Sequence, residues 1–218
     1  MRRFALAAIV GVATAGILCA APAPDDVGPW FIDLSAHTNV KLTDGFHSNA
    51  NDGNNLANLP TGKQKFADVK FNVGTGIVQL GSSMLSGKST KAEGIKVDHA
   101  VAKLRFLHST GWKAAEGQVI AKYVVHYDDK STADIEIAYG RDVVDWWVTP
   151  NDKAPTVSKV AWEGKNDAVK DGETKITLFM TTWENPNPKK KIVSIDFIAT
   201  MPQGQAAPFC IAMTAEDK

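Results

Sequence analysis

The sequence predicts an all-β protein, built from antiparallel strands in a sandwich or barrel. Short stretches in which apolar and polar side chains alternate recur along the 218 residues, with turn-forming residues between them. No segment keeps a helical period over three turns. Many short strands separated by turns are typical of an antiparallel sandwich or barrel. A chain of this length can hold one sizeable core, so we expect a single domain.

The amino terminus predicts export from the cytoplasm. Two arginines precede an apolar run over residues 4–18, and small residues follow, which is the pattern of a secretory signal peptide. The run is short and rich in Ala and Gly for a spanning helix, and no later segment reaches the length of a membrane span. We expect residues 1–21 to be a signal peptide, 22–29 a short linker and 30–218 one domain that is secreted, either extracellular or in the periplasm or cell envelope.

The cysteines and the charges narrow the class of protein further. Cys19 raises the alternative of lipid attachment, although Leu18 stands where a lipobox has a small residue. If Cys19 is removed with the signal peptide, Cys210 has no partner for an internal disulfide, so the fold must depend on its core. The chain has 24 basic and 24 acidic side chains, a balance that does not favour nucleic acid as a partner.

The predicted strands follow one another from residue 30 to the end of the chain. Strict alternation marks residues 69–73, where Val, Phe and Val are separated by Lys and Asn, and a short apolar run marks residues 77–80. The expected strands are residues 30–34, 69–73, 77–80, 95–97, 104–108, 119–127, 135–139, 158–162, 175–183, 192–200 and 209–214.

The clearest local feature is a β-hairpin within residues 122–147. Apolar and polar side chains alternate on both sides of Asp128 to Ser131, whose side chains favour a turn. The second strand leads into Gly-Arg-Asp-Val-Val-Asp-Trp-Trp at residues 140–147. A cation, two carboxylates and two indoles thus follow one strand exit, and we expect a binding site there first.

Aromatic and polar residues also gather at other strand exits. Indole faces stack on the C–H faces of sugar rings, and polar side chains give directional bonds to hydroxyls. The candidate ligand-binding residues are His108, Trp112, Arg141, Asp142, Trp146, Trp183 and Asn185. The three tryptophans in this set could instead close the ends of the core, and both interpretations stay open. Trp30 and Trp162 lie within strand patterns and are expected in the core.

Residues 39–62 predict a long loop, because Asn, Asp and Gly dominate the segment. Such a loop in a compact domain is usually functional or tied down. Asp44, Asp52 and Asn55 could supply oxygen ligands to a structural Ca²⁺, although their spacing is not that of an EF-hand. A solvated cluster of turns is the alternative.

Catalysis is not expected. The chain lacks a Gly-x-Ser-x-Gly elbow, a His-Glu-x-x-His helix motif, a phosphate loop and a Cys-x-x-Cys pair. A glycosidase would need two facing carboxylates, for which Asp142, Asp145 and Glu184 are the candidates. Any chain with 24 acidic residues offers such pairs by chance, so a polysaccharide-active enzyme is the least favoured hypothesis.

Several motifs together resemble a group of secreted bacterial domains. They are LPTGKQKF at 59–66, VKFNV at 69–73, LHSTGW at 107–112, the stretch 123–147, and TWENP at 182–186 followed by IDF at 195–197. These domains are β-sandwiches of the galactose-binding-domain-like type, found alone or appended to glycoside hydrolases and other polysaccharide-processing proteins. The resemblance covers about residues 30–216 and implies a jelly-roll sandwich.

The same resemblance implies carbohydrate binding through loops at one end of the sandwich, often with a structural Ca²⁺, although some of these domains are spacers or protein-binding modules. Two positions depart from the group: GFHSN at 45–49 replaces a Gly-Trp-Thr-Asp pattern, and Lys130 stands where glycine is common. We therefore expect a secreted, non-catalytic carbohydrate-binding module. The alternative is a structural or protein-interaction module of the cell envelope.

Overall fold

The computed structural model describes residues 29–47 and 53–217, which form strands and turns and no helix. The predicted signal peptide lies outside these residues. No described segment could cross a membrane as a helix. The strands are β1 (Trp30–Ile32), β2 (Val40–Lys41), β3 (Gly62–Phe66), β4 (Val69–Val73), β5 (Gly76–Gln79), β6 (Lys91–Ala100), β7 (Lys103–Gly111), β8 (Val119–Tyr127), β9 (Thr132–Ala138), β10 (Trp147–Val148), β11 (Lys159–Gly164), β12 (Lys175–Glu184), β13 (Lys191–Ala199) and β14 (Ala207–Glu216).

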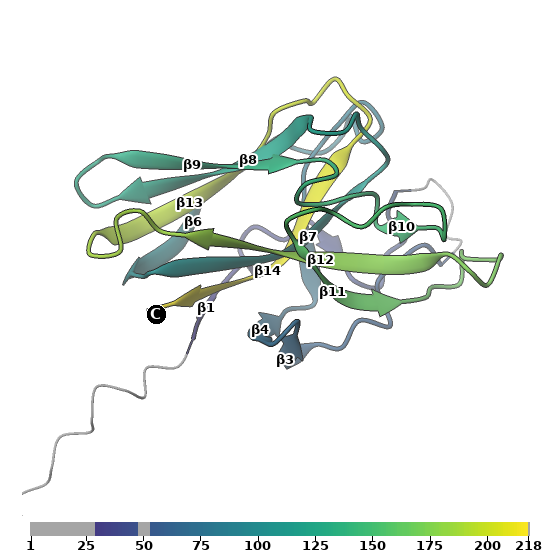
Figure 1. The fold of residues 1–218 in the computed structure, drawn as a ribbon, viewed down its shortest axis with the longest axis horizontal. Coiled ribbons are helices and arrows are strands. Elements are labelled where there is room, and N and C mark those ends of the chain that lie inside the picture. Colours follow the sequence, from purple (N-terminus) through teal and green to yellow (C-terminus); the bar gives the residue numbers. More distant parts are fainter. Residues whose placement is uncertain (1–28, 48–52, 218) are drawn as a thin grey trace, which may run out of the picture.

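These strands form a larger sheet of eight strands, a smaller sheet of four and the separate β3–β4 hairpin (Figure 1). The larger sheet has the order β10-β12-β7-β14-β5-β2, with β1 also paired to β14 and β11 to β12. The smaller sheet has the order β6-β13-β8-β9. The paired strands are antiparallel, as the sequence predicts.

The main core lies between the two sheets. Phe106 on β7 stacks on Tyr123 on β8 with 4.1 Å between ring centroids, and Tyr123 stacks on Phe197 on β13 at 4.5 Å. All three side chains are buried. Because these rings come from facing strands of both sheets, their burial holds the layers together. The arrangement confirms the all-β prediction and is compatible with a β-sandwich.

The opposite face of the larger sheet is also covered. The β3–β4 hairpin contributes Phe71, and the preceding segment contributes Phe46 and Leu56, which form a second cluster with Phe209 on β14. Consequently β14 is buried on both faces along nearly its whole length. This double coverage explains why its sequence is a continuous apolar run rather than an alternating one.

The predicted hairpin is confirmed by the pairing of β8 with β9. The amide of Tyr127 donates to the carbonyl of Ser131 at 2.9 Å across the turn. Lys130 has a φ of 69°, a backbone conformation that favours glycine. Glycine would adopt this conformation without strain.

The two tryptophans expected in the core lie nearer the surface. Trp30 is 38% exposed and stacks on His99 at 3.9 Å, because β1 is a short strand that pairs only near the end of β14. Trp162 on β11 is half-buried and packs at the margin of the second cluster. The core prediction was therefore wrong for Trp30 and only partly correct for Trp162.

Candidate functional site

His108, one of the predicted ligand-binding residues, is held in the interior. It lies on β7 between the sheets, with Nδ1 3.2 Å from the hydroxyl of Tyr123 and Nε2 2.9 Å from Oγ1 of Thr181. Burial lowers the pKa of His108 to about 3, so its ring is neutral at neutral pH. Both nitrogen atoms have protein partners, and the side chain serves the core.

Asn185, another predicted residue, is also buried and bonded within the protein. Its Oδ1 accepts from the hydroxyl of Tyr127 at 2.6 Å and from the amide of Asn187 at 2.9 Å. Its Nδ2 donates to the carbonyl of Val101 at 2.7 Å. Asn185 therefore fastens the end of β12 to neighbouring segments.

Arg141, Asp142 and Trp183 come together along an open groove of about 420 Å³ between β9 and the end of β12. Oδ2 of Asp142 accepts from the amide of Ala138 at 2.8 Å and from Nε of Arg141 at 2.7 Å. Arg141 also donates to the carbonyl of Glu136. The carboxylate of Asp142 is buried in these bonds and closes the turn that follows β9.

Trp112 and Trp146 meet in a different place, which we call the aromatic pocket. It has a volume of about 230 Å³ and is lined by His47, Asn54, Trp112, Asp145, Trp146 and Trp147. Trp112 and Trp147 are half-buried, whereas Trp146 is only 2% exposed and forms part of the second cluster. A backbone bridge between Thr110 and Asp145 joins the end of β7 to the segment before β10.

Two walls of the aromatic pocket have unusual backbone conformations. Trp112 directly follows β7 and has a φ of 58°, and His47 has a φ of 65°. Positive φ is uncommon for bulky residues, so tertiary contacts must hold both in place. The ring of His47 lies 4.9 Å from that of Trp112 and 5.2 Å from that of Trp146, centroid to centroid.

His47 is fixed as a neutral ring with a defined tautomer. The amide nitrogen of Gln79 donates to the carbonyls of Leu80, Ala207 and Pro208, which turns its Oε1 toward His47. Nε2 of His47 lies 2.7 Å from that oxygen and therefore carries the proton. Nδ1 is buried and has no hydrogen-bond partner in the part of the chain that the structure describes. Burial lowers the pKa of His47 to about 4.

Asn54 fixes the indole of Trp147. Its Oδ1 accepts from Nε1 of Trp147 at 3.0 Å and from Nδ2 of Asn166 at 3.1 Å. Its Nδ2 donates to the carbonyl of Phe46 at 3.1 Å. The orientation of this aromatic wall is thus set by a buried amide from a distant segment.

Asp145 supplies the carboxylate of the aromatic pocket. Oδ1 accepts from the amide of Trp147 at 3.1 Å, yet burial raises the pKa of Asp145 to about 6. Asp145 forms no salt bridge within residues 29–47 and 53–217. The positive charge of Lys113 lowers the pKa of Asp145 in part, but the ammonium of Lys113 forms its salt bridge with Asp152, 2.6 Å from Oδ1.

The predicted calcium ligands are only partly visible. Asp44 is exposed and accepts from the amide of Lys41 at 3.3 Å, and Oδ1 of Asn55 accepts from the amide of Ala57 at 3.1 Å. Asp52 lies outside the described residues. Within the described ranges, no three His, Cys, Asp or Glu side chains are grouped so that they could hold a metal ion.

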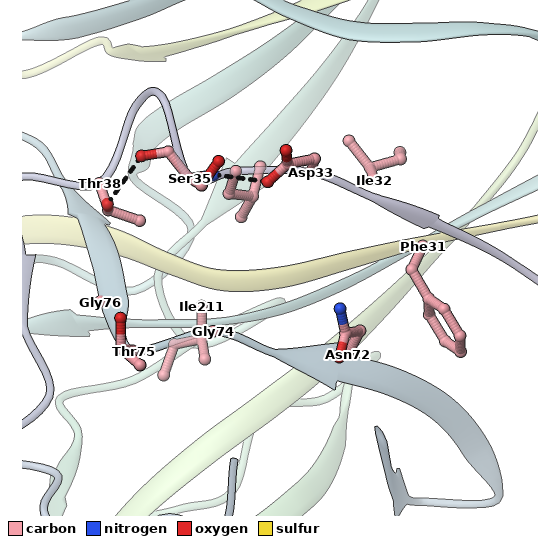
Figure 2. A pocket seen from close by; sticks show the side chains of 11 residues that line it. Phe31, Ile32, Asp33, Ser35, Thr38, Asn72, Gly74, Thr75, Gly76 and Ile211 are labelled. Atoms are coloured by element: carbon pink, nitrogen blue, oxygen red, sulfur yellow. Dashed lines mark hydrogen bonds between the residues drawn. The ribbon is translucent and has the colours of Figure 1, made fainter. Parts of the chain in front are cut away.

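Another cavity, of about 150 Å³, lies beside β1 (Figure 2). Figure 2 shows the polar side chains at its upper edge bonded to their own turn: Oδ1 of Asp33 accepts from the amide of Ser35 at 2.9 Å, and Oγ1 of Thr38 donates to the carbonyl of Ser35 at 3.0 Å. These groups shape the turn after β1. The aromatic pocket, with its indoles and partly buried carboxylate, offers more to a ligand.

Part of the aromatic pocket can be predicted from the sequence. Trp112 and Trp146 are among the predicted ligand-binding residues, and Asp145 and Trp147 lie in the stretch 140–147 that follows the hairpin. His47 and Asn54 were not predicted to line a sugar site, because they come from the Asn-rich loop considered for calcium. The signal that could have found them was an aromatic–histidine pair, Phe46-His47, within a segment otherwise made of turn residues.

Comparison with known proteins adds no assignment. No protein-family model matches the chain, and no curated protein matches it.

Proposed function

We propose that the chain is a secreted, non-catalytic carbohydrate-binding module and that the aromatic pocket is its sugar site. One observation carries this proposal: the half-buried indoles of Trp112 and Trp147 line the same hollow as the carboxylate of Asp145. Sugar recognition needs apolar faces for the ring and fixed polar groups for its substituents, and this hollow offers both. The two-sheet architecture supports the finer proposal of a jelly-roll fold of the galactose-binding-domain-like type.

The size of the pocket suits a small ligand. Sites for drug-sized molecules enclose about 300–1,000 Å³, so a hollow of about 230 Å³ suits one sugar unit of a longer glycan. Stacking and polar contacts of about 1 kcal/mol each would give micromolar to millimolar affinity for such a unit. A module of this kind gains useful affinity when several copies or several sugar units act together.

The proposed roles differ among the residues of the pocket. Trp112 and Trp147 are the stacking walls and Asp145 is the polar anchor, while Trp146 forms the buried floor. His108 and Asn185 are omitted from the proposed site because their polar atoms are bonded in the interior.

One observation supports the alternative function, a structural or protein-interaction module of the cell envelope. Trp146 is core, which is what a structural or protein-interaction module would require of the aromatic residues. The partial exposure of Trp112 and Trp147 favours ligand binding instead, because tryptophans with a purely structural role would be buried.

The first test is binding of the purified protein to a broad glycan array, with Ca²⁺ and then with a chelator. We expect binding that Trp112→Ala removes and that Trp30→Ala preserves, since Trp30 is an exposed tryptophan outside the pocket. Loss of binding in the chelator would support the proposed Ca²⁺ site that includes Asp44, Asp52 and Asn55. A folded protein that binds no glycan would remove the carbohydrate proposal in favour of the envelope module.

A separate assay tests the proposed lack of catalysis. Asp142 is bonded inside its turn, and Glu184 lies 3.1 Å from Nζ of Lys103, so neither carboxylate is poised beside the aromatic pocket. We expect no new reducing ends when polysaccharides are incubated with the protein. Release that disappears in Asp142→Asn or Glu184→Gln would establish a hydrolase.

A further inference from the structure

We infer that the sugar bound in the aromatic pocket carries a free amine, so that the ligand class is an amino sugar in its ammonium form. This inference rests on the proposed carbohydrate function and names the substrate class of the same site. It follows from two features of the lining: its walls are indoles, and the group that carries charge among them is the carboxylate of Asp145.

The charge of the pocket follows from the groups that face Asp145. Above the pKa of about 6 that burial gives it, Asp145 is an anion. His47, whose pKa is about 4, is then neutral and cannot compensate it. Lys113 and Asp152 neutralise each other across 2.6 Å. Tyr139 stays uncharged, because burial raises its pKa above the usual value of 10.0. Among the residues that the structure describes, the pocket therefore has a net negative charge at neutral pH.

An ammonium group complements this arrangement better than a hydroxyl does. A partly buried carboxylate without a cationic partner has lost hydration, and a ligand cation restores a favourable interaction. The faces of Trp112 and Trp147 attract the same cation through their ring quadrupoles. A neutral sugar can accept stacking and donate hydrogen bonds, but it gains neither the ion pair nor the cation–π contact.

Three oligosaccharides of equal length test the inference cleanly. They share a β-1,4-linked glucose skeleton and carry, at carbon 2 of each unit, a hydroxyl, an acetamido group or a free amine. We expect calorimetry at pH 7 to show that the amine form binds about tenfold or more tightly than either neutral form. Because the chain has nearly balanced charge, a general attraction for cations contributes little.

A matched pair of acid-to-amide variants assigns the effect to Asp145. We expect Asp145→Asn to weaken the amine form about tenfold and the hydroxyl form by a smaller factor, because asparagine keeps a hydrogen-bonding oxygen but loses the negative charge. Asp134→Asn is the control, because Asp134 is an exposed acid on β9, outside the aromatic pocket and paired with Lys122 at 2.6 Å. It should leave all three affinities unchanged.

The pH dependence gives a second readout. Between pH 7 and pH 5, His47 stays neutral; Lys113 stays charged because its hydrogen bond to Asp152 raises its pKa. Burial raises the pKa of Asp152, but its hydrogen bonds, including the one from Lys113, lower it by more, so Asp152 stays ionised. Among the groups of the protein, protonation of Asp145 should therefore weaken the amine form severalfold at pH 5, although the sugar amine gains protons over the same window and offsets part of the loss. Asp145→Asn should abolish this loss of affinity at pH 5.

The outcomes separate this inference from the function on which it rests. Equal binding of the three oligosaccharides, or preference for the acetylated form, would overturn the amino-sugar inference and leave carbohydrate binding intact. An affinity for the amine form that changes neither in Asp145→Asn nor between pH 7 and pH 5 would also overturn it. Failure of the folded protein to bind these three or any arrayed glycan would remove both proposals.

Discussion

The imidazole of His47 lies 4.9 Å from the indole of Trp112, centroid to centroid, and both residues have positive φ, 65° and 58°. They come from segments that are far apart in the sequence and meet beside the end of β7. Two bulky residues in the left-handed region would not keep these conformations through local preference. Tertiary packing therefore holds both residues in these conformations, and this packing fixes the shape of the aromatic pocket.

Gly111 is the residue that makes this contact fit. A Cβ atom there would lie 2.7 Å from Nδ1 and Cε1 of His47, and the ring cannot retreat because it is bonded to Gln79 and packed against Phe209. We expect Gly111→Ala to lower the free energy of unfolding by about 1–3 kcal/mol and to weaken glycan binding. Gly74→Ala is the control, since a Cβ atom there meets nothing within 4 Å. Equal denaturation midpoints for the two variants would contradict this account.

The tryptophans of the pocket should separate stability from binding. Trp146 is 2% exposed and stacks on Phe46 at 4.7 Å, so Trp146→Ala should cost about 3–5 kcal/mol of unfolding free energy. Trp112 is half-buried, and Trp112→Ala should cost less than half as much while removing glycan binding. Urea denaturation of both variants, followed by binding of the folded fraction, measures the difference. A mild loss of stability in Trp146→Ala would show that its site can relax.

Lys130 offers a route to higher stability at the hairpin turn. Its φ of 69° places a side chain where glycine is unstrained. We expect Lys130→Gly to raise the free energy of unfolding by about 1 kcal/mol, because the relief of strain exceeds the added freedom of the unfolded chain. Lys153→Gly provides the comparison, as Lys153 is exposed and is not among the residues with positive φ. Calorimetry should show a higher melting temperature only for Lys130→Gly.

The strands could be predicted because the alternation of apolar and polar side chains in each strand shows which of its faces is buried. In β4, Val69, Phe71 and Val73 are buried and the two residues between them are exposed, as their alternation indicates. The coverage of both faces of β14 could be suspected from its apolar run but not assigned to a partner, because the β3–β4 hairpin reaches it only through tertiary folding. The exposure of Trp30 was missed for the same reason: its strand pattern does not reveal that β1 is short and peripheral.

The candidate site could be predicted only in part. Strand exits rich in aromatic residues directed attention to Trp112 and Trp146, but the contacts with Phe46 and Phe209 that bury Trp146 come from other segments, and Trp112 stays half-buried. Gln79, which sets the tautomer of His47, sits in an apolar strand and gives no local signal of that role. Residue type alone could not show that His108 is bonded on both nitrogens.

The ionised carboxylate of Asp145 should destabilise the fold at neutral pH, as expected for a partly buried acid whose proposed role is ligand binding. Burial raises its pKa from 3.8 to about 6, so the folded state holds the proton more tightly than the unfolded state. This difference corresponds to at most roughly 3 kcal/mol well above pH 6, falls below about 1 kcal/mol at pH 4 and vanishes below about pH 3. Partial solvent access reduces it, and we expect Asp145→Asn to gain about 1–2 kcal/mol at pH 7 and little at pH 4. Denaturation at both pH values measures this; a loss of stability at pH 7 would mean that the carboxylate makes contacts an amide cannot replace.

As the pH falls, the buried histidines should lower the free energy of unfolding, whereas Asp145 should raise it. Burial lowers the pKa of His47 to about 4 and of His108 to about 3, so between pH 6 and pH 4.5 both rings are neutral when folded and charged when unfolded. Unfolding therefore takes up about two protons at the histidines and releases about one from Asp145, a net uptake of about one. Stability should fall as the pH falls through this window.

The variants of these groups make the balance measurable. The slope of unfolding free energy against pH should double in Asp145→Asn, because the opposing proton release is gone, and it should nearly vanish in His108→Gln. Glutamine can still meet Thr181 or Tyr123 with its amide, so the folded state of this variant should persist. The slope depends on proton uptake rather than on total stability, so a general loss of stability in His108→Gln would not imitate the effect. An unchanged slope in both variants would show that other groups govern the acid response.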